Sequence, residues 1–114
     1  LDEADRERLE FTLKLAGTRR SDRYDEFLAE FKRRPDLKRT DFGMDIFASN
    51  PNFAIFVLQS RFKQQGKAVG PPDGYASRRT LKALSRACRT LPYAHPCRDT
   101  VMQPKIIGEL LAQR

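Results

Sequence analysis

Two helical segments joined by a loop rich in glycine and proline, between residues 51 and 88, constrain the fold of this chain more than any other feature. Asn50-Pro51 predicts a helix start, because Asn is a favourable N-cap and Pro fits the first helical position. We expect this helix to run from Pro51 to about Gln65, with Gly66 as the residue that ends it. The Gly-Pro-Pro-Asp-Gly sequence at 70–74 then predicts a loop rather than a continued helix.

The residues after this loop predict how the chain turns. Asp73 can accept hydrogen bonds from the following backbone N–H groups while Gly74 takes a positive φ. Ser77 is a good N-cap for a second helix. The apolar positions that we expect this helix to bury are Leu81, Leu84 and Ala87. The stretch therefore predicts two crossed helices held by a rigid corner, which we call the Asp73-Gly74 corner.

The spacing of this stretch follows a pattern of Leu-Gln, a glycine seven residues after the Gln, Asp-Gly seven residues further on, and then Thr and Ala. The residues that fit it in one ungapped register are Leu58, Gln59, Gly66, Asp73, Gly74, Thr80 and Ala83. With this spacing, residues 54–88 resemble the helical peptidoglycan-binding domain that is appended to many cell-wall hydrolases. One position departs, because the glycine that this family has three residues after Asp-Gly is Ser77 here. Ser77 either caps the helix or narrows a groove that the family keeps open.

The resemblance implies non-catalytic binding of the glycan–peptide of the bacterial wall, in a shallow groove between the two helices. The residues on the matching rim are Gln59, Lys67, Tyr75, Arg78 and Arg79. A tyrosine ring offers a platform for a sugar, and arginine forks can pair with stem-peptide carboxylates. The alternative for the two arginines is a solvated helix start, although two cations there oppose the helix dipole. We expect the matched residues Asp73, Gly74 and Thr80 to hold the corner rather than touch the ligand.

The net charge of +7 is unevenly distributed along the chain. Residues 1–50 carry eleven Lys/Arg and twelve Asp/Glu, whereas residues 51–114 carry eleven Lys/Arg and only three Asp/Glu. This asymmetry favours peptidoglycan or another anionic envelope polymer as the partner of the second half, or else a solvated cationic surface. Nucleic acid is a weaker alternative, because no helix shows a continuous basic face and no familiar nucleic-acid-binding motif is present.

The two cysteines, Cys88 and Cys97, lie nine positions apart in a segment bent by Pro92 and Pro96. We predict that they form a disulfide, which would place the protein in an oxidising compartment, periplasmic or extracellular. The alternative is two free, buried thiols in a cytosolic protein. Since residue 1 is Leu rather than Met, we also expect a trimmed or processed chain. No apolar run of 18 residues is present, so we predict no membrane span.

Helical periodicity extends over the rest of the chain, and no strand-like alternation is sustained. The apolar positions at helical spacing are Leu9, Leu13 and Ala16, with Phe11 and Leu15 beside them; Tyr24, Phe27, Leu28 and Phe31; and Ile106, Ile107, Leu110 and Leu111. Ser21 and the Thr100–Gln103 pair predict further helix starts, and residues 42–48 form a short amphipathic segment. We therefore predict an all-α fold, a small bundle of about five helices. Residues 1–50 would be a helical extension packed on a peptidoglycan-binding-like domain at 51–114.

Residues that could support catalysis or hold a metal are sparse. His95 and Cys97 lack the further ligands that a structural zinc site needs, and no third group orients them for nucleophilic chemistry. Glu10 and Glu30 lie on charged helix faces, and Glu109 has no visible second acid for glycan cleavage. We predict no catalytic residue, metal or cofactor, and we rank a small glycan-cleaving enzyme last. A protein-interaction or adaptor module that reuses the same fold is the main alternative, favoured by the aromatic-rich segment 42–56 and the N-terminal helices.

Overall fold

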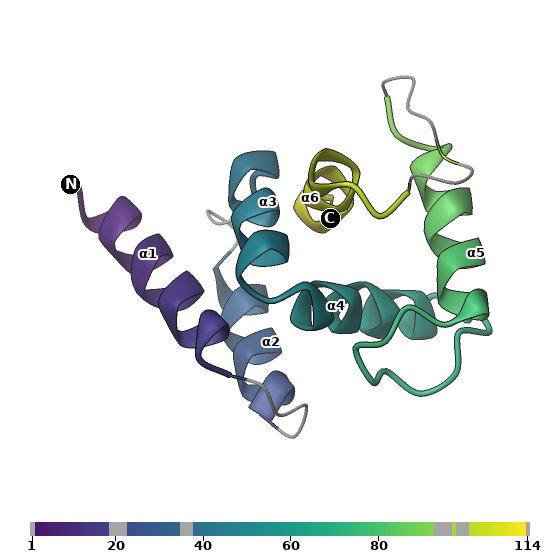
Figure 1. Ribbon diagram of the computed structural model, residues 1–114, viewed down its shortest axis with the longest axis horizontal. Coiled ribbons are helices and arrows are strands. Elements are labelled where there is room, and N and C mark those ends of the chain that lie inside the picture. Colours follow the sequence, from purple (N-terminus) through teal and green to yellow (C-terminus); the bar gives the residue numbers. More distant parts are fainter. Residues whose placement is uncertain (1, 19–22, 35–37, 93–96, 98–100, 114) are drawn as a thin grey trace.

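The computed structural model describes residues 2–18, 23–34, 38–92, 97 and 101–113. Over these residues the chain forms six α-helices and no strand, which confirms the predicted all-α class (Figure 1). The helices are α1 (Glu3–Ala16), α2 (Tyr24–Arg33), α3 (Thr40–Ser49), α4 (Pro51–Gln64), α5 (Arg78–Cys88) and α6 (Pro104–Ala112). None of them is both long enough and apolar enough to cross a membrane, within the part of the chain that the structure describes.

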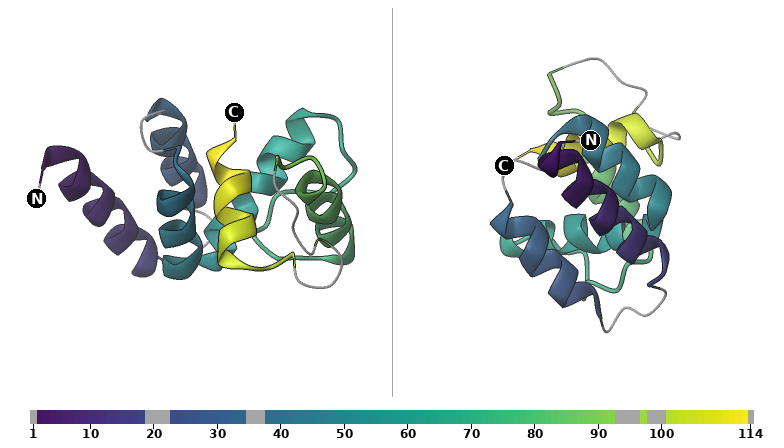
Figure 2. Two further views of the ribbon diagram at one scale, coloured as in Figure 1. Left: turned by 90° about the horizontal axis from the view of Figure 1, so that it is seen from above. Right: turned by 90° about the vertical axis from the view of Figure 1, so that its left-hand side faces the viewer.

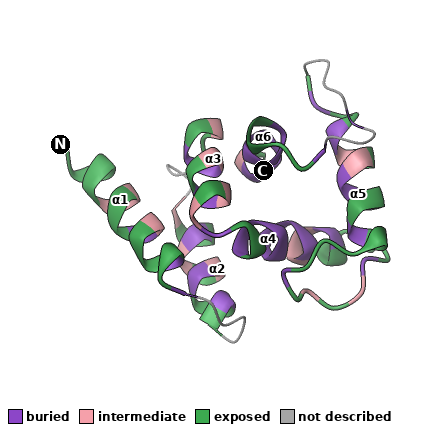
Figure 3. Cartoon of the chain, in the orientation of Figure 1, coloured by how far each residue is buried: buried purple, intermediate pink, exposed green. Residues whose placement is uncertain are grey.

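Helix α4 is the centre of the molecule. It packs against α2, α3 and α6, and every residue from Phe53 to Gln59 is buried, as the continuous purple ribbon in Figure 3 shows. A helix that is apolar on all sides is stable only when neighbours cover all of its faces. Helices α1, α2 and α3 lie towards one end of α4, α5 lies across its other end, and α6 passes over it (Figures 1 and 2).

An aromatic cluster joins the first four helices. Its rings, with centroids 5.4–6.5 Å apart, are those of Phe11, Tyr24, Phe27, Phe31, Phe42, Phe53 and Phe56. Most of these pairs are edge-to-face or tilted, which are favourable arrangements for aromatic quadrupoles. The buried apolar residues of the described chain form one cluster. Residues before and after position 50 both contribute side chains to this cluster.

Asn50 is a buried polar junction beside this cluster. Its side-chain oxygen accepts a hydrogen bond from the backbone N–H of Phe53, at 3.0 Å, and so caps α4 as the sequence predicted. Its Nδ2 donates to the carbonyl oxygens of Leu15 and Thr18, at 3.1 and 2.8 Å. The hydroxyl of Tyr24 donates to the same side-chain oxygen at 3.3 Å. One side chain thus ties the end of α1 and the start of α2 to the start of α4.

Two glycines allow α3 and α6 to make the most extensive helix–helix contact of the fold. A Cβ at Gly43 would lie 2.6 Å from the carbonyl oxygen of Gly108, and a Cβ at Gly108 would lie 2.7 Å from that of Thr40. Both obstacles are backbone atoms of the facing helix, so they cannot move aside like a flexible side chain. The two helices therefore approach as closely as they do only because both positions lack a side chain.

Arg8 connects α1 to α3 at the surface. Its guanidinium donates to the carboxylates of Asp41, at 2.9 Å, and Asp45. Slight burial raises the pKa of the Asp41 carboxyl, but the hydrogen bond from Arg8, helped by the backbone N–H of Phe42 and by charge, holds that pKa below its ordinary value. Arg34 at the end of α2 pairs with Glu7 on α1 in a second surface contact.

Some sequence expectations for the elements differ from the structure. Leu9 and Leu13 are 49% and 63% exposed, whereas Phe11 and Leu15 are buried. Leu9 and Phe11 are two residues apart, so the Leu9–Leu13 pair and the Phe11–Leu15 pair lie about 200° apart around the helix. Only the face that carries Phe11 packs against the aromatic cluster. Helix α6 begins at Pro104 with Gln103 as an N-cap that makes no side-chain cap bond. The expected caps Ser21 and Thr100 lie outside the described residues.

Candidate binding site at the Asp73-Gly74 corner

Helix α4 ends in a Schellman motif at Gly66, which has a φ of 79°. The N–H of Gly66 donates to the carbonyl oxygen of Lys63, and the N–H of Lys67 donates to that of Phe62, at 3.0 and 2.9 Å. The ammonium of Lys67 lies 4.9 Å from the ring centroid of Phe62, which completes the usual side-chain contact across this motif. The predicted helix stop is therefore confirmed, with its mechanism.

The side-chain amide of Gln59 organises the corner. Its oxygen accepts hydrogen bonds from the backbone N–H groups of Asp73 and Gly74, at 3.1 and 2.9 Å. Its nitrogen lies within hydrogen-bond distance of Asp73 Oδ1, the carbonyl oxygen of Tyr75 and Thr80 Oγ1, at 3.2, 2.9 and 3.0 Å. A single side-chain amide is thus hydrogen-bonded to the turn at Asp73-Gly74, to Tyr75 after it and to the first turn of α5.

Gly74 is required for two separate reasons. Its φ is 84°, a conformation that L side chains rarely adopt. In addition, a Cβ there would lie 2.8 Å from the carbonyl oxygen of Asn52 and 3.3 Å from the ring of Tyr24. The corner therefore packs directly on the start of α4 and on α2. Asp73 supports the turn by accepting a hydrogen bond from the N–H of Tyr75 at 2.9 Å, as predicted.

Ser77 and Thr80 form the start of α5. Ser77 Oγ accepts a hydrogen bond from the backbone N–H of Thr80 at 3.3 Å, and the two hydroxyls are 3.1 Å apart. Ser77 has a φ of −67°, which any L residue adopts, so the backbone at this position does not require the glycine of the resembling family. Thr80 is fully buried, and Leu58 and Ala83 are buried with it. These residues act structurally in this chain.

Gln59 is the one predicted rim residue that the structure moves to the interior. It is 1% exposed, and both atoms of its amide are hydrogen-bonded within the corner. Its amide is thus not available to a ligand unless the corner opens. The sequence feature that could have predicted the burial of Gln59 is the apolar run from Phe53 to Leu58, because this run leaves the helix with no solvent-facing side just before Gln59.

Tyr75, Arg78 and Arg79 lie within five residues of one another at the start of α5, and all three are exposed. The side chain of Tyr75 is 65% exposed although its backbone N–H and C=O are both fixed, by Asp73 and Gln59. Both arginines lie in the first turn of α5, which contains no acid. No carboxylate of the described residues forms an ion pair with either arginine. The result is an exposed aromatic side chain on a fixed backbone, followed three and four residues later by two cations that form no ion pair with a described carboxylate; we call these three residues the corner rim.

Lys67 is exposed, as predicted. Its backbone N–H and its ammonium both contact Phe62, which lies one helical turn after Gln59. Among the described residues, no hydrogen bond or ion pair joins Lys67 to Tyr75, Arg78 or Arg79, so we do not include it in the corner rim.

Leu81 was expected in the core but is 36% exposed. It lies three residues after Arg78, so the two side chains are neighbours on the surface of α5. Thr80, Ala83, Leu84 and Cys88 already fill the buried face of that helix, and this complete stripe was the signal that Leu81 lies outside it. Leu81 adds an apolar contact beside the corner rim.

The predicted disulfide between Cys88 and Cys97 is present, with Cα atoms 5.7 Å apart. His95 lies outside the described residues, and Glu109 is buried within α6. Among the residues that the structure describes, no three His, Cys, Asp or Glu side chains are grouped so that they could hold a metal ion. The corner rim is therefore the site that the predicted residues build.

Comparison of the chain with protein-family models, with curated protein sequences and with solved structures finds no match in any of the three.

Proposed function

We propose that this protein binds peptidoglycan through the corner rim without cleaving it. The observation that carries the proposal is the combination at the rim: an exposed Tyr75 whose backbone is held by hydrogen bonds, followed by Arg78 and Arg79, which form no ion pair with any described carboxylate. An exposed tyrosine ring offers an apolar platform for a sugar ring, and guanidinium forks suit the carboxylates of stem peptides. The resemblance of residues 54–88 to a wall-binding family supports the same ligand.

Charge also supports an anionic polymer as the ligand. Cations in the first turn of a helix are destabilised by its dipole, and in α5 no acid in that turn offsets this effect. A ligand carboxylate at this position would remove the unfavourable interaction. Residues 51–114 carry a large excess of Lys and Arg, which would draw such a polymer towards this half of the molecule.

A pull-down on purified sacculi tests the proposal. The wild-type protein should be retained at about 0.15 M salt, where surface charges are screened beyond about 8 Å. Arg78→Ala/Arg79→Ala should reduce retention about tenfold or more, and so should Tyr75→Ala separately. A tenfold loss of affinity corresponds to about 1.4 kcal/mol, which is the contribution of one good polar or stacking contact. The matched control is Lys82→Ala/Arg86→Ala, which removes the same charge from exposed positions of the same helix.

Three results would contradict the proposal. Wild-type protein that is not retained at all excludes wall binding. Equal losses for the rim and control variants indicate bulk electrostatic attraction instead of a site. A fall in the turbidity of sacculi on adding the protein would show cleavage, and would replace the proposal by a glycan-cleaving activity.

A second candidate, the protein-interaction or adaptor module, is favoured by Leu9 and Leu13. These side chains lie one turn apart on α1 and are about half or more exposed. The aromatic segment 42–56 does not support this candidate, because Phe42, Phe53 and Phe56 are buried in the core. Binding to a wall enzyme that Leu9→Ser/Leu13→Ser abolishes, and that Arg78→Ala/Arg79→Ala leaves intact, would establish this candidate.

A further inference from the structure

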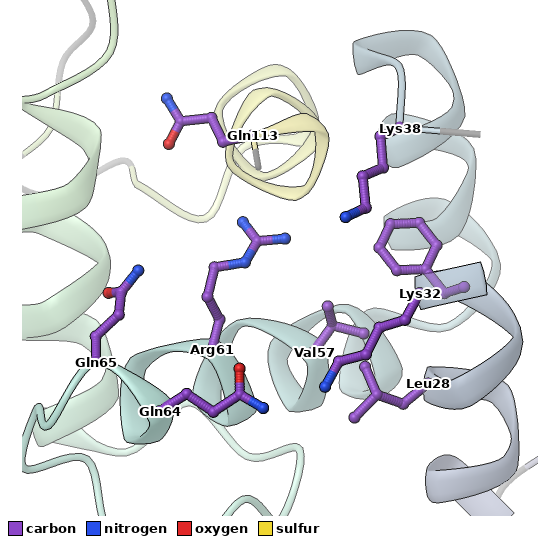
Figure 4. Close-up of a pocket in the computed structure, with 9 residues that line it drawn as sticks. Leu28, Lys32, Lys38, Val57, Arg61, Gln64, Gln65 and Gln113 are labelled. Carbon is purple, nitrogen blue, oxygen red and sulfur yellow. The ribbon is translucent and has the colours of Figure 1, made fainter. Parts of the chain in front are cut away.

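A pocket of about 480 Å³ lies between α2, α4 and the end of α6, away from the corner rim (Figure 4). This volume is within the range of sites for small organic molecules, which run from about 300 to 1,000 Å³. Its floor is apolar and is formed by Leu28, Phe31 and Val57. Phe31 and Val57 also belong to the buried core, so this floor is fixed by the packing of the fold.

Among the described residues that line the pocket, the polar ones are cations and amides, and none is an acid. The cations are Lys32, Lys38 and Arg61, from three different segments of the chain. The amides are those of Gln64, Gln65 and Gln113. No carboxylate of the described residues forms an ion pair with any of the three cations. In Figure 4 the ammonium of Lys38 and the guanidinium of Arg61 both point into the space between the helices.

Arg61 is held in place from one side only. Its Nη1 donates to the carbonyl oxygen of Leu110 at 2.6 Å and its Nη2 lies 3.4 Å from that of Leu111, so it caps the C-terminal end of α6. These two contacts use two of the five N–H donors of a guanidinium. They also cover the carbonyl groups whose partial negative charge would repel an anion. Burial in this position lowers the pKa of Arg61.

We propose that this pocket binds a small organic anion with an apolar body, such as a carboxylate or phosphate monoester. The acidic head would accept hydrogen bonds from Lys38, Arg61 and the glutamine amides. The apolar body would cover Leu28, Phe31 and Val57. This inference goes beyond wall binding and does not rest on it, because the pocket shares no residue with the corner rim.

Fluorescence titration with 1-anilinonaphthalene-8-sulfonate tests the proposal on the full chain. This probe has a sulfonate on an aromatic body, and N-phenyl-1-naphthylamine is the same body without the charge. We expect one sulfonate probe bound per chain, at least tenfold more tightly than the neutral analogue. Equal affinity for the two probes, or several weak sites, would overturn the proposal.

Charge-reversal variants locate the binding. Lys38→Glu and Lys32→Glu should each weaken probe binding at least tenfold. The control is Lys63→Glu, which makes the same change in net charge at an exposed position two residues from Arg61, on the other side of α4. It should change affinity less than about twofold, as expected for a screened charge outside the site. Far-UV circular dichroism confirms that each variant is folded, and equal weakening by Lys63→Glu would exclude this pocket as the site.

Competition identifies the acidic head. Octanoate and octyl phosphate should displace the probe, whereas octanol should not. Displacement by only one of the two anions assigns the site to carboxylates or to phosphates. Displacement by octanol at the same concentration, or by neither anion, contradicts the proposal. Arg78→Ala/Arg79→Ala should bind the probe normally, so that loss of wall binding and loss of pocket binding are distinguishable.

Discussion

Gln59→Leu should be among the most destabilising single substitutions in this chain, although Gln and Leu have similar volumes. The change removes all the hydrogen bonds of the amide, which join it to Asp73, Gly74, Tyr75 and Thr80. The N–H of Gly74 is buried and has no water to replace its partner, which alone costs about 1–3 kcal/mol. Of the other groups, the carboxylate of Asp73 and the carbonyl of Tyr75 can turn to solvent, so their loss costs less.

Burial of the new leucine offsets part of this cost, by about 1.5–2 kcal/mol at most. Each remaining lost hydrogen bond contributes roughly 0.5–1 kcal/mol, so we expect a net loss of about 2–3 kcal/mol in the free energy of unfolding. With a urea m-value of about 1–3 kcal/mol/M, the unfolding midpoint should fall by about 0.7–3 M. Urea titration followed by circular dichroism measures this shift.

The matched control is Gln64→Leu, the same change on the same helix at an exposed position. Its effect should stay within about 0.5 kcal/mol, as for ordinary surface changes. Amide hydrogen exchange provides a local measurement, because the N–H of Gly74 should lose its protection in Gln59→Leu under conditions where the core stays protected. Equal midpoints for the two variants, or unchanged exchange at Gly74, would refute the role that we assign to Gln59.

Three further predictions concern other parts of the fold. Gly108→Ala should lower stability by about 1–2 kcal/mol in thermal unfolding, because the overlap of the new Cβ with the backbone of α3 outweighs a helix-propensity gain of about 1 kcal/mol. A more stable Gly108→Ala variant would show that α3 and α6 can move apart at little cost. Cys88→Ser/Cys97→Ser should lower the free energy of unfolding by about 2.5–3 kcal/mol, because the disulfide closes a loop of about ten residues. Reducing agent should bring the wild type to the same urea midpoint. A wild-type midpoint that reducing agent does not change would disprove the disulfide. The pKa of Asp41 is lowered in the folded state. The ionised carboxylate therefore stabilises the fold above the unfolded pKa of about 3.9, and this stabilisation is lost as pH falls through the folded pKa. For this exposed pair the loss should be below about 1 kcal/mol, and Arg8→Gln should abolish this pH dependence in acid titrations of stability.

The sequence predicted the elements well wherever chemistry fixes a local conformation. Asn50-Pro51 started α4, Gly66 ended it, and Asp73-Gly74 formed the turn, because caps and positive φ values depend on a few neighbouring residues. The same local logic predicted the Cys88–Cys97 pair. Ser77 as the cap of α5 is a further example.

Predictions failed where the outcome depends on which face of a helix finds a partner. Helical spacing is equally good for the Leu9–Leu13 pair and the Phe11–Leu15 pair. The second pair is the buried one because aromatic rings from other helices pack against Phe11. Gln59 was expected on the rim of a groove because of the resemblance of residues 54–88 to the wall-binding family. Its burial depends on a loop fourteen or more residues away that supplies partners for its amide. The pocket between α2, α4 and the end of α6 could not be predicted, since the residues that line it come from separate parts of the chain.

The bonding of Gln59 has a consequence for which insertions this chain can tolerate. The amide must reach Gly74 and Thr80 at once, so the stretch from Asp73 to Thr80 has a fixed length. Val69 is buried in the core, but Gly70 after it has open space around it and Pro71 is exposed. Because the entropy of closing a longer loop rises only slowly with length, residues inserted between Gly70 and Pro72 should cost little stability. One extra residue between Asp73 and Thr80, in contrast, would break the hydrogen bonds that Gln59 makes to both ends of this stretch.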